Sequence, residues 1–439
     1  MLMKRILLLV TCVAWAASCS RETAIENVQN ASEKVVETTQ NVADRFDTSV
    51  PMGTRATREE IEQQRFNAEW RRLRSFQTRR TAQPVPPTQA PATQPAAVPA
   101  PTPAAVPDPT PVNATFVTDP KFGETLKGMN AAAIETLPLR VPIKGDVNGP
   151  SVLRAQVLLD RARYAVGAID GRWGKNSEIA VYWFQDQNGI QPTGEIDEPT
   201  FRALLGQSGN APALISYTLT AEDVTGPYTK LPEDVYEKAK LDCLCYENLG
   251  EKLAEQFHIT QDLLTVLNPG VDLVNAQAGQ SVIVTNVRQP EPENAPKDVQ
   301  RIVVSVKGSY LHALDASNRV LLHAPTTLGN KYDPSPSETQ KVVATAYNPD
   351  FRYQPKLFHE VPDSDPEALL KPGPNSPVGR VWMALDKPHF GIHGTGDPES
   401  IGYASSHGCV RLTNWDAVDL ARRVGKGVPV EFLDTRGEK

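Results

Sequence analysis

Apolar residues recur at helical spacing in two runs between residues 148 and 206. In each run they fall three or four positions apart, which places them on one face of a helix. The residues that make these faces are Val152, Ala155, Leu158, Leu159, Ile179, Ala180, Trp183 and Phe184. Gly189 and Gly194 end the second run, and a short helix follows from Pro199. The pattern predicts a small three-helix bundle.

A second segment, 241–288, mixes helical and strand patterns. We expect a helix from Leu249, a turn at His258–Thr260, and a second helix that ends at Leu267 before the sequence "LNPG". The alternating stretch "AGQSVIV" then predicts a strand that follows a turn at Gly279. These elements make a small α/β module.

The segment 298–434 alternates apolar and polar residues. The stretch "RIVVSVKGSYLHALDASNRVLLHAPTTLG" predicts three short strands joined by turns. A proline-dense insert between Phe351 and Val378 indicates a long functional loop, and "VWMAL" after it a strand. A helix at "NWDAVDLARRV" and a strand at "VPVEFLD" complete a mainly antiparallel β domain. With 439 residues, the chain is expected to be a multidomain α+β protein.

Residues 1–19 have the layout of an export signal, because Lys4-Arg5 precede an apolar core that is too short to span a membrane comfortably. "AASC" at Ala16–Cys19 resembles a bacterial lipobox, in which the cysteine becomes a lipidated first residue. Ordinary cleavage nearby and a buried N-terminal strand are the alternatives. We therefore expect export to the periplasm or cell envelope, with a lipid anchor on a membrane if Cys19 is modified.

Residues 20–115 are polar at first and then rich in Pro, Ala, Thr and Gln. Such a composition cannot bury enough apolar surface to fold, so we expect a disordered or helical tether followed by an extended spacer. The formal net charge of −7 argues against nucleic acid as a partner.

Cysteine usage indicates one reactive thiol in an exported chain. Beyond the N-terminal segment only Cys243, Cys245 and Cys409 remain. Cys243 and Cys245 are separated by one residue and would make a strained disulfide at best, so Cys409 has no obvious structural partner. Cys409 lies in "GIHGTGDPESIGYASSHGCVRL", together with His393 and His407.

Three hypotheses account for this grouping. Zinc could be bound by His393, His407 and Cys409, but no fourth ligand stands nearby. A buried structural cysteine would leave the histidines and the glycine-rich turn unexplained. Nucleophilic catalysis explains them together, because an imidazole stabilises a thiolate and the amides of Gly408 and Cys409 would serve as oxyanion donors. Gly394 would leave one face of His393 open. The catalytic hypothesis needs neither a metal nor a cofactor.

Two segments before the β domain resemble cell-wall modules. "DGRWGKNSEIAVYWFQDQNGIQPTGEID" resembles the helical peptidoglycan-binding domain, which has D-G-x-[FW]-G, then F-Q, then a second glycine pair in the same order. A generic three-helix bundle is the alternative, and wall binding is expected around Trp173 and Phe184. Residues 241–288 resemble a degenerate LysM module in which "KLDCLCYENLG" replaces the opening strand. The LysM-like module either binds glycan or is a structural remnant, and His258 is expected to be packed or solvated.

"HGTGDPESIGYASSHGCVRL" resembles the signature of the L,D-transpeptidase (YkuD-type) catalytic domain, with 15 residues between His393 and Cys409. The family's upstream T-P-x-G glycine is missing, replaced by Ser337-Glu338. The resemblance implies that Cys409 is the nucleophile and His393 the general base and acid. The remaining positions that match or flank the signature are expected to support the reaction or bind substrate: His407, Gly408, Ser406, Arg411 and Gly394.

His407 and Arg411 have the same parity as Cys409 along an extended segment, so they are expected to lie on its side of the strand. His407 would position the substrate or tune the thiolate. Arg411 would pair with a substrate carboxylate, or else be structural. Ser406 is expected to serve the turn or to orient a histidine.

The resemblance implies acyl transfer on peptidoglycan. Cys409 would attack the stem tetrapeptide after meso-diaminopimelate, release D-alanine and pass the acyl group to an amine. That amine would belong to a second stem peptide, giving a 3-3 cross-link, or to an anchored wall protein. Water as acceptor would make the protein an L,D-carboxypeptidase. A non-catalytic peptidoglycan-binding tether is the alternative from a different functional class.

Overall fold

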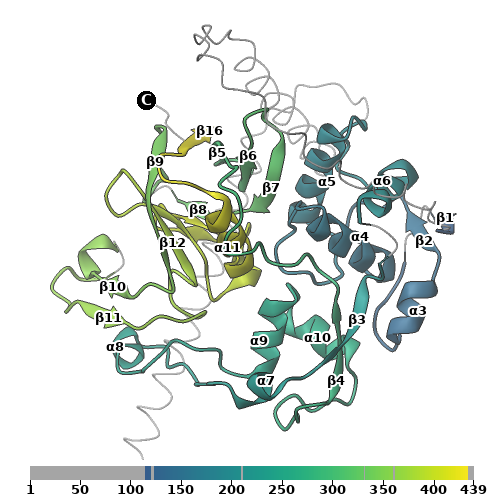
Figure 1. Cartoon of the computed structure of the whole chain (residues 1–439), viewed down its shortest axis with the longest axis horizontal. Helices are drawn as coiled ribbons and strands as arrows, with labels where there is room; N and C mark the ends of the chain where they lie inside the picture. Colours follow the sequence, from purple (N-terminus) through teal and green to yellow (C-terminus); the bar gives the residue numbers. More distant parts are fainter. Residues whose placement is uncertain (1–113, 120–122, 209–210, 331, 359–360, 434–439) are drawn as a thin grey trace, which may run out of the picture. The chain divides into compact units, whose positions relative to one another are not determined.

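The computed structural model describes residues 114–119, 123–208, 211–330, 332–358 and 361–433 (Figure 1). The predicted export signal, the lipidation candidate Cys19 and most of the predicted spacer lie outside this described part. Within it, no helix combines the length and the apolar character that a membrane crossing requires.

The predicted three-helix bundle is present. Its helices are α4 (Pro150–Arg161), α5 (Lys175–Gln187) and α6 (Glu198–Ser208). Every apolar residue that the sequence placed on an inward face of the two runs is buried. Ahead of the bundle lie α3 (Ala131–Thr136) and a parallel pair of strands, β1 (Phe116–Thr118) and β2 (Leu139–Val141).

The bundle also buries the two aromatic residues around which wall binding was expected. Phe184 is fully buried and meets the ring of Tyr164 edge-on at a centroid distance of 5.4 Å. Trp173 is only 5% exposed. Both side chains therefore belong to the core of the bundle. Wall binding by the bundle around them stays a prediction.

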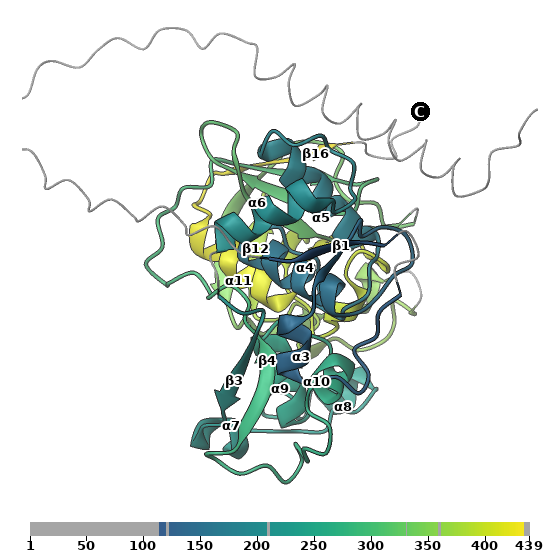
Figure 2. The ribbon, with the colours of Figure 1, turned by 90° about the vertical axis from the view of Figure 1, so that its right-hand side faces the viewer.

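The second module contains the predicted helices and strand: α9 (Leu249–Gln256), α10 (Gln261–Leu267) and β4 (Ser281–Thr285). Its opening strand is β3 (Leu214–Thr218), which pairs antiparallel with β4 over five residues (Figure 2). Two short helices, α7 (Ala221–Thr225) and α8 (Val235–Lys238), follow β3.

The module therefore begins before residue 241, and its opening strand is not in "KLDCLCYENLG", which forms no strand. The sequence hid this because about 60 residues separate the two paired strands, and no local pattern reports such a long-range pairing.

Cys243 and Cys245 form a disulfide, which answers the question that the sequence left open. The buried Leu244 between them is paired on both sides with the end of the proline-dense insert. Its N–H donates to the carbonyl of Pro372, and its own carbonyl accepts from the N–H of Asn375, each at 3.0 Å. The disulfide turn thus anchors the insert to the second module.

The third domain is built on an eight-stranded sheet in the order β15-β13-β12-β9-β16-β5-β6-β7. The pairings β13–β15 and β16–β5 are parallel and the others antiparallel. In chain order the strands are β5 (Arg301–Ser305), β6 (Tyr310–Leu314), β7 (Val320–Pro325), β9 (Gln340–Tyr347), β12 (Val381–Leu385), β13 (Gly391–His393), β15 (Val410–Arg411) and β16 (Pro429–Leu433). The mainly antiparallel domain expected from the sequence is confirmed.

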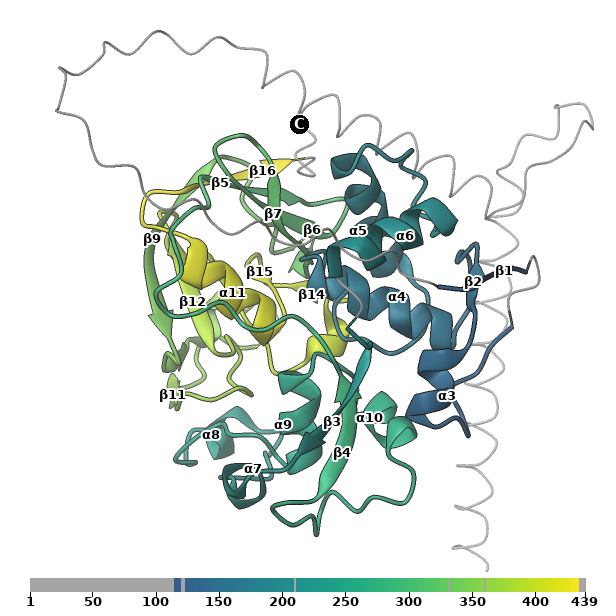
Figure 3. The ribbon, with the colours of Figure 1, turned by 45° about the vertical axis from the view of Figure 1, so that its right-hand side comes forward.

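Helix α11 (Asn414–Arg423) packs against β12 and β13 and also contacts α9 of the second module (Figure 3). Its apolar residues join a continuous core with the strands, which includes Ile302, Leu311, Met383, Val410 and Leu420.

Two further strand pairs belong to the third domain: β8 (Leu328–Gly329) with β14 (Ser405–Ser406), and β10 (Phe351–Tyr353) with β11 (Ala368–Leu370). Single 3-10 turns, η1 (Pro355–Leu357) and η2 (Pro398–Ser400), complete the domain.

One buried arginine joins the three modules. Arg288, which follows β4, forms ion pairs with Asp160 of α4 and with Asp416 and Asp419 of α11. All four side chains are at most 3% exposed. His258 stacks on Trp415 and its Nδ1 lies 3.0 Å from Asp160. Burial would raise the pKa of Asp160, but the Arg288 charge and His258 hold it at about 2. At this junction the buried carboxylates are therefore stabilised by ion pairs with the shared Arg288 guanidinium.

Substituting Arg288→Met should lower the free energy of unfolding by about 3–5 kcal/mol, because buried carboxylates lose their shared cation. The matched control is Arg202→Met, which removes an exposed ion pair with Glu198 on α6 and should cost about 0.5 kcal/mol or less. Urea unfolding followed by tryptophan fluorescence measures both. Equal losses in the two variants would contradict a structural role for the Arg288 cluster.

Candidate active site

The two residues expected to carry catalysis lie at two neighbouring strands, His393 at the end of β13 (Gly391–His393) and Cys409 just before β15 (Val410–Arg411). β13 and β15 pair in parallel, with Ile392 opposite Val410 and His393 opposite Arg411. Cys409 directly precedes β15, so it lies beside the strand that ends with His393. Because side chains alternate along strands, His393, Arg411 and Cys409 share the parity that points to one face.

Cys409 is the free cysteine of the described part of the chain, and its side chain is partly buried. Its sulfur donates a hydrogen bond to the carbonyl oxygen of His389 at 3.6 Å. Burial raises the pKa of the Cys409 thiol, while the backbone N–H of Gly391 and the charge of Arg411 oppose that rise. The resting group is therefore a thiol at neutral pH, and it needs a base to become a nucleophile.

His393 has the surroundings of a neutral base. It is 4% exposed and stacks on the ring of Trp382 at a centroid distance of 5.4 Å. Nδ1 lies 2.7 Å from the carbonyl oxygen of Gly394, which can only accept, so Nδ1 carries the proton and Nε2 the lone pair. Burial, and next the charge of Arg411, lower the pKa of His393 to about 3. The imidazole is neutral at physiological pH and able to accept a proton at Nε2.

Gly394 is required for a reason that the sequence did not reveal. A Cβ atom built on this residue would lie 2.2 Å from Oδ1 of Asn414. The glycine therefore makes room for the buried amide of Asn414. The expectation that it leaves one face of His393 open stays a prediction. Its carbonyl remains important, because it sets the protonation of the imidazole.

The turn before the nucleophile is closed by Ser406. Its hydroxyl donates to the carbonyl of Cys409 at 2.7 Å and accepts from the N–H of Gly408 at 3.2 Å. The Gly408 amide is thus engaged within the turn, which contradicts its expected role as an oxyanion donor. Gly408 has φ +101°, and a Cβ there would lie 2.7 Å from the ring of Phe390, so a side chain would be both strained and crowded.

The same turn changes the interpretation of His407. Because the backbone turns at Gly408, residues 407–409 are not an extended segment, and the parity argument that put His407 beside Cys409 fails. The His407 ring instead meets Phe358 edge-on at a centroid distance of 4.9 Å. Phe358 follows η1 in the insert and stacks on Tyr353 of β10. The insert predicted as a loop therefore contains a short antiparallel strand pair, β10 with β11. Through Phe358 it contacts His407, which lies two residues before Cys409.

Arg411 places a positive charge beside both candidate catalytic groups. Its charge favours the thiolate of Cys409 and disfavours protonation of His393. The guanidinium is largely buried, which lowers its pKa, while the charges of Cys409 and Asp397 act in the opposite direction. Its Nε is buried and has no hydrogen-bond partner in the described structure. An arginine so placed supports negative charge on the sulfur, a role beyond the carboxylate binding expected from the sequence.

Within the ranges that the structure describes, His393, His407 and Cys409 do not gather with a further Asp, Glu, His or Cys into a set that could hold a metal ion.

Comparisons with known proteins now identify the family. The model of the L,D-transpeptidase catalytic domain (YkuD) matches residues 299–432, and a model described as "Putative peptidoglycan binding domain" matches residues 148–204. A Bacillus licheniformis protein named "Putative L,D-transpeptidase YkuD" is 31% identical over 182 residues, which make up 42% of this chain and 92% of that protein. The chain belongs to the L,D-transpeptidase family. The Bacillus subtilis protein of the same name is 30% identical over 178 residues, 40% of this chain and 89% of that protein.

Solved L,D-transpeptidase structures are also similar. L,D-transpeptidase 3 from Mycobacterium tuberculosis, in complex with a faropenem-derived adduct, is 16% identical with a TM-score of 0.26, over 35% of this chain and 64% of that chain. An L,D-transpeptidase from Mycobacterium smegmatis is 20% identical with a TM-score of 0.26, over 35% of this chain and 63% of that chain. This transpeptidase thus spans just under two thirds of the length of those solved chains.

Several residues of the transpeptidase site were missed by the sequence analysis. Trp382 supports the His393 ring, the carbonyl of His389 accepts from the thiol, and Phe390 packs on Gly408. A weak signal existed in "PHFGIH", where His389 and Phe390 lie shortly before His393, the first residue of the signature. No local signal pointed to Asn414 or to its partner Glu255, because the two are 159 residues apart.

Proposed function

We propose that this L,D-transpeptidase acts on the stem tetrapeptide of peptidoglycan through an acyl-enzyme on Cys409. The parallel pairing of β13 with β15 carries the proposal, since it brings the segment with a free thiol, just before β15, beside the strand that ends with a neutral, buried imidazole. The match to a peptidoglycan-binding domain in residues 148–204 supports peptidoglycan as the substrate.

In the first half-reaction Nε2 of His393 accepts the thiol proton as Sγ of Cys409 attacks the carbonyl carbon after meso-diaminopimelate. The C–S bond forms, and the C–N bond to the terminal D-alanine then breaks. The imidazolium returns its proton to the leaving amine of D-alanine. The charge of Arg411 favours negative charge on the sulfur, and Trp382 holds the imidazole ring in place.

In the second half-reaction an acceptor amine attacks the thioester carbonyl, with His393 accepting the proton that the amine loses. The C–S bond breaks and the proton returns to the sulfur of Cys409. The acceptor is the side-chain amine of a second stem peptide, which gives a 3-3 cross-link. An amine of an anchored wall protein and water are the other acceptors that the same thioester would accept.

Purified disaccharide-tetrapeptide separates these products by mass. We expect the wild-type transpeptidase to release D-alanine and to accumulate a cross-linked dimer, and we expect Cys409→Ala to do neither. Accumulation of the tripeptide monomer alone would show that water is the acceptor. Unchanged tetrapeptide with wild-type enzyme, at a concentration that saturates sacculi in a binding assay, would contradict the proposed function.

The same proposal places the transpeptidase in the cell envelope. An export signal in residues 1–19, with Cys19 as the lipidated residue, and the Pro-rich spacer would let a membrane-held enzyme reach the wall.

A further inference from the structure

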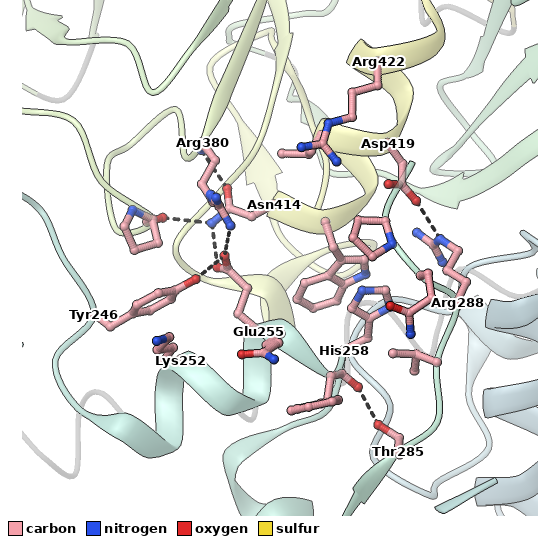
Figure 4. A pocket seen from close by; sticks show the side chains of 18 of the residues that line it. Tyr246, Lys252, Glu255, His258, Thr285, Arg288, Arg380, Asn414, Asp419 and Arg422 are labelled. Atoms are coloured by element: carbon pink, nitrogen blue, oxygen red, sulfur yellow. Dashed lines mark hydrogen bonds and ion pairs between the residues drawn. The ribbon is translucent and has the colours of Figure 1, made fainter. Parts of the chain in front are cut away.

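A buried carboxylate of the second module reaches the catalytic domain at the junction between α9 and α11. Glu255 of α9 is 10% exposed and accepts two hydrogen bonds, one from Nδ2 of Asn414 and one from the hydroxyl of Tyr246, each at 2.7 Å (Figure 4). Nη1 of Arg380 lies 3.8 Å from the same carboxylate. Of these residues, Arg380 and Asn414 belong to the catalytic domain.

Asn414 is the residue through which this contact acts. It is 1% exposed, and all of its amide is used: Nδ2 also donates to the carbonyl of Pro374 at 3.0 Å, and Oδ1 accepts from the N–H of Arg380 at 3.0 Å. Oδ1 is wedged between two glycines, since a Cβ on Gly379 would lie 2.0 Å from it and a Cβ on Gly394 2.2 Å. This amide therefore packs closely against the backbone at Gly394.

Gly394 in turn controls His393. Its carbonyl accepts from Nδ1 of His393 at 2.7 Å, and its N–H donates to the carbonyl of Val381 at 3.2 Å. A displacement of the Gly394 peptide would turn the imidazole or change which nitrogen carries the proton. Misplacing a catalytic group by about 1 Å can lower a rate by about 100-fold.

We propose that Glu255 is a positioning residue for acyl transfer: it holds the amide of Asn414, which fixes the Gly394 carbonyl that orients His393. The second module is then a working part of the catalytic site, and not a wall-binding accessory alone. This inference rests on the proposed function of His393 as the base.

Because a cavity lies beside Glu255, replacing this residue can disturb the position of Asn414 without greatly destabilising the fold. A cavity of about 610 Å³ lies beside this network, lined among others by Tyr246, Lys252, Arg380, Asn414 and Arg422. If Glu255 is truncated, water can enter beside Asn414 and pair with its Nδ2, so the donor is not left unsatisfied. Asn414 then has a mobile water as its partner in place of the fixed carboxylate of Glu255. Burial raises the pKa of Glu255 despite the bonds from Asn414 and Tyr246. Glutamine has the same shape and keeps a carbonyl oxygen that can accept from Asn414.

Three substitutions at this position test the proposal by the rate at which Cys409 is acylated. Glu255→Ala and the space-filling Glu255→Leu should lower the acylation rate constant by about 10–100-fold with an unchanged KM for the stem peptide. Glu255→Gln should restore it to within about threefold, because its carbonyl still accepts from Asn414. The control Gln256→Ala removes an exposed neighbour that lines the same cavity and should have no effect.

The second readout is the Nδ1–H proton resonance of His393, measured by NMR. It should be sharp in the wild type and in Glu255→Gln, and broadened or lost in Glu255→Leu. Full acylation rates in both Ala and Leu variants, or equal losses in Leu and Gln, would overturn the proposal. If the wild-type enzyme itself forms no acyl-enzyme, the proposed function fails, whereas an unaltered His393 resonance in Glu255→Leu is the result that refutes positioning.

Discussion

His393→Ala should lower the rate of Cys409 acylation by about 10²–10⁴-fold, the contribution typical of a positioned general base. Without Nε2, nothing on the neighbouring strand accepts the thiol proton, and burial keeps the pKa of that thiol above its usual value. The measurement is the single-turnover appearance of the acyl-enzyme with disaccharide-tetrapeptide, followed by intact-protein mass. His407→Ala is the matched comparison and should have a smaller effect, because this ring packs on Phe358. A larger loss in His407→Ala than in His393→Ala would reverse the assignment.

The pH dependence of the same rate follows from the pKa of His393. Burial lowers this pKa to about 3, so the imidazole stays neutral as the pH falls and loses its function as a base only near that value. An imidazole with the ordinary pKa near 6.5 would be about 97% protonated at pH 5. We therefore expect wild-type acylation to persist at pH 5. At alkaline pH the rate should rise until Cys409 ionises, above the usual pKa of a thiol.

Cys409→Ala should abolish acylation and product formation while leaving sacculus binding unchanged. The substitution removes one small, partly buried sulfur, and the matched peptidoglycan-binding domain spans residues 148–204, far from it in sequence. Pull-down with purified sacculi and the tetrapeptide assay together measure both properties. Loss of binding along with activity would argue against separate binding and catalytic functions.

Local sequence patterns were sufficient for most helices and strands. The inward faces of α4 and α5, the boundaries of α9 and α10, and strands β5, β6, β7, β12 and β16 of the third domain follow from short-range periodicity. The opening strand β3 was missed because its pairing with β4 depends on residues that are distant in the chain.

In the candidate site, too, local patterns identified the residues but not their long-range contacts. The signature singled out His393 and Cys409 across a gap of 15 residues, and the structure has β13, which ends at His393, next to β15, which follows Cys409. The signature did not predict which hydrogen bonds these residues form. The Gly408 amide is used by Ser406, and Gly394 is small because Asn414 occupies the space beside it. Such details depend on tertiary contacts, which no single segment encodes.

The central claim is a live nucleophile at Cys409, and covalent labelling tests it most directly. The full-length protein is incubated with a carbapenem, a β-lactam acylating agent, and its intact mass is then measured, with peptide mapping of any adduct. We predict one added carbapenem mass per chain, located on Cys409, formed much more slowly in His393→Ala and absent from Cys409→Ala. No adduct on the wild-type protein, or an adduct that persists in Cys409→Ala, would contradict the account and favour a non-catalytic peptidoglycan-binding tether.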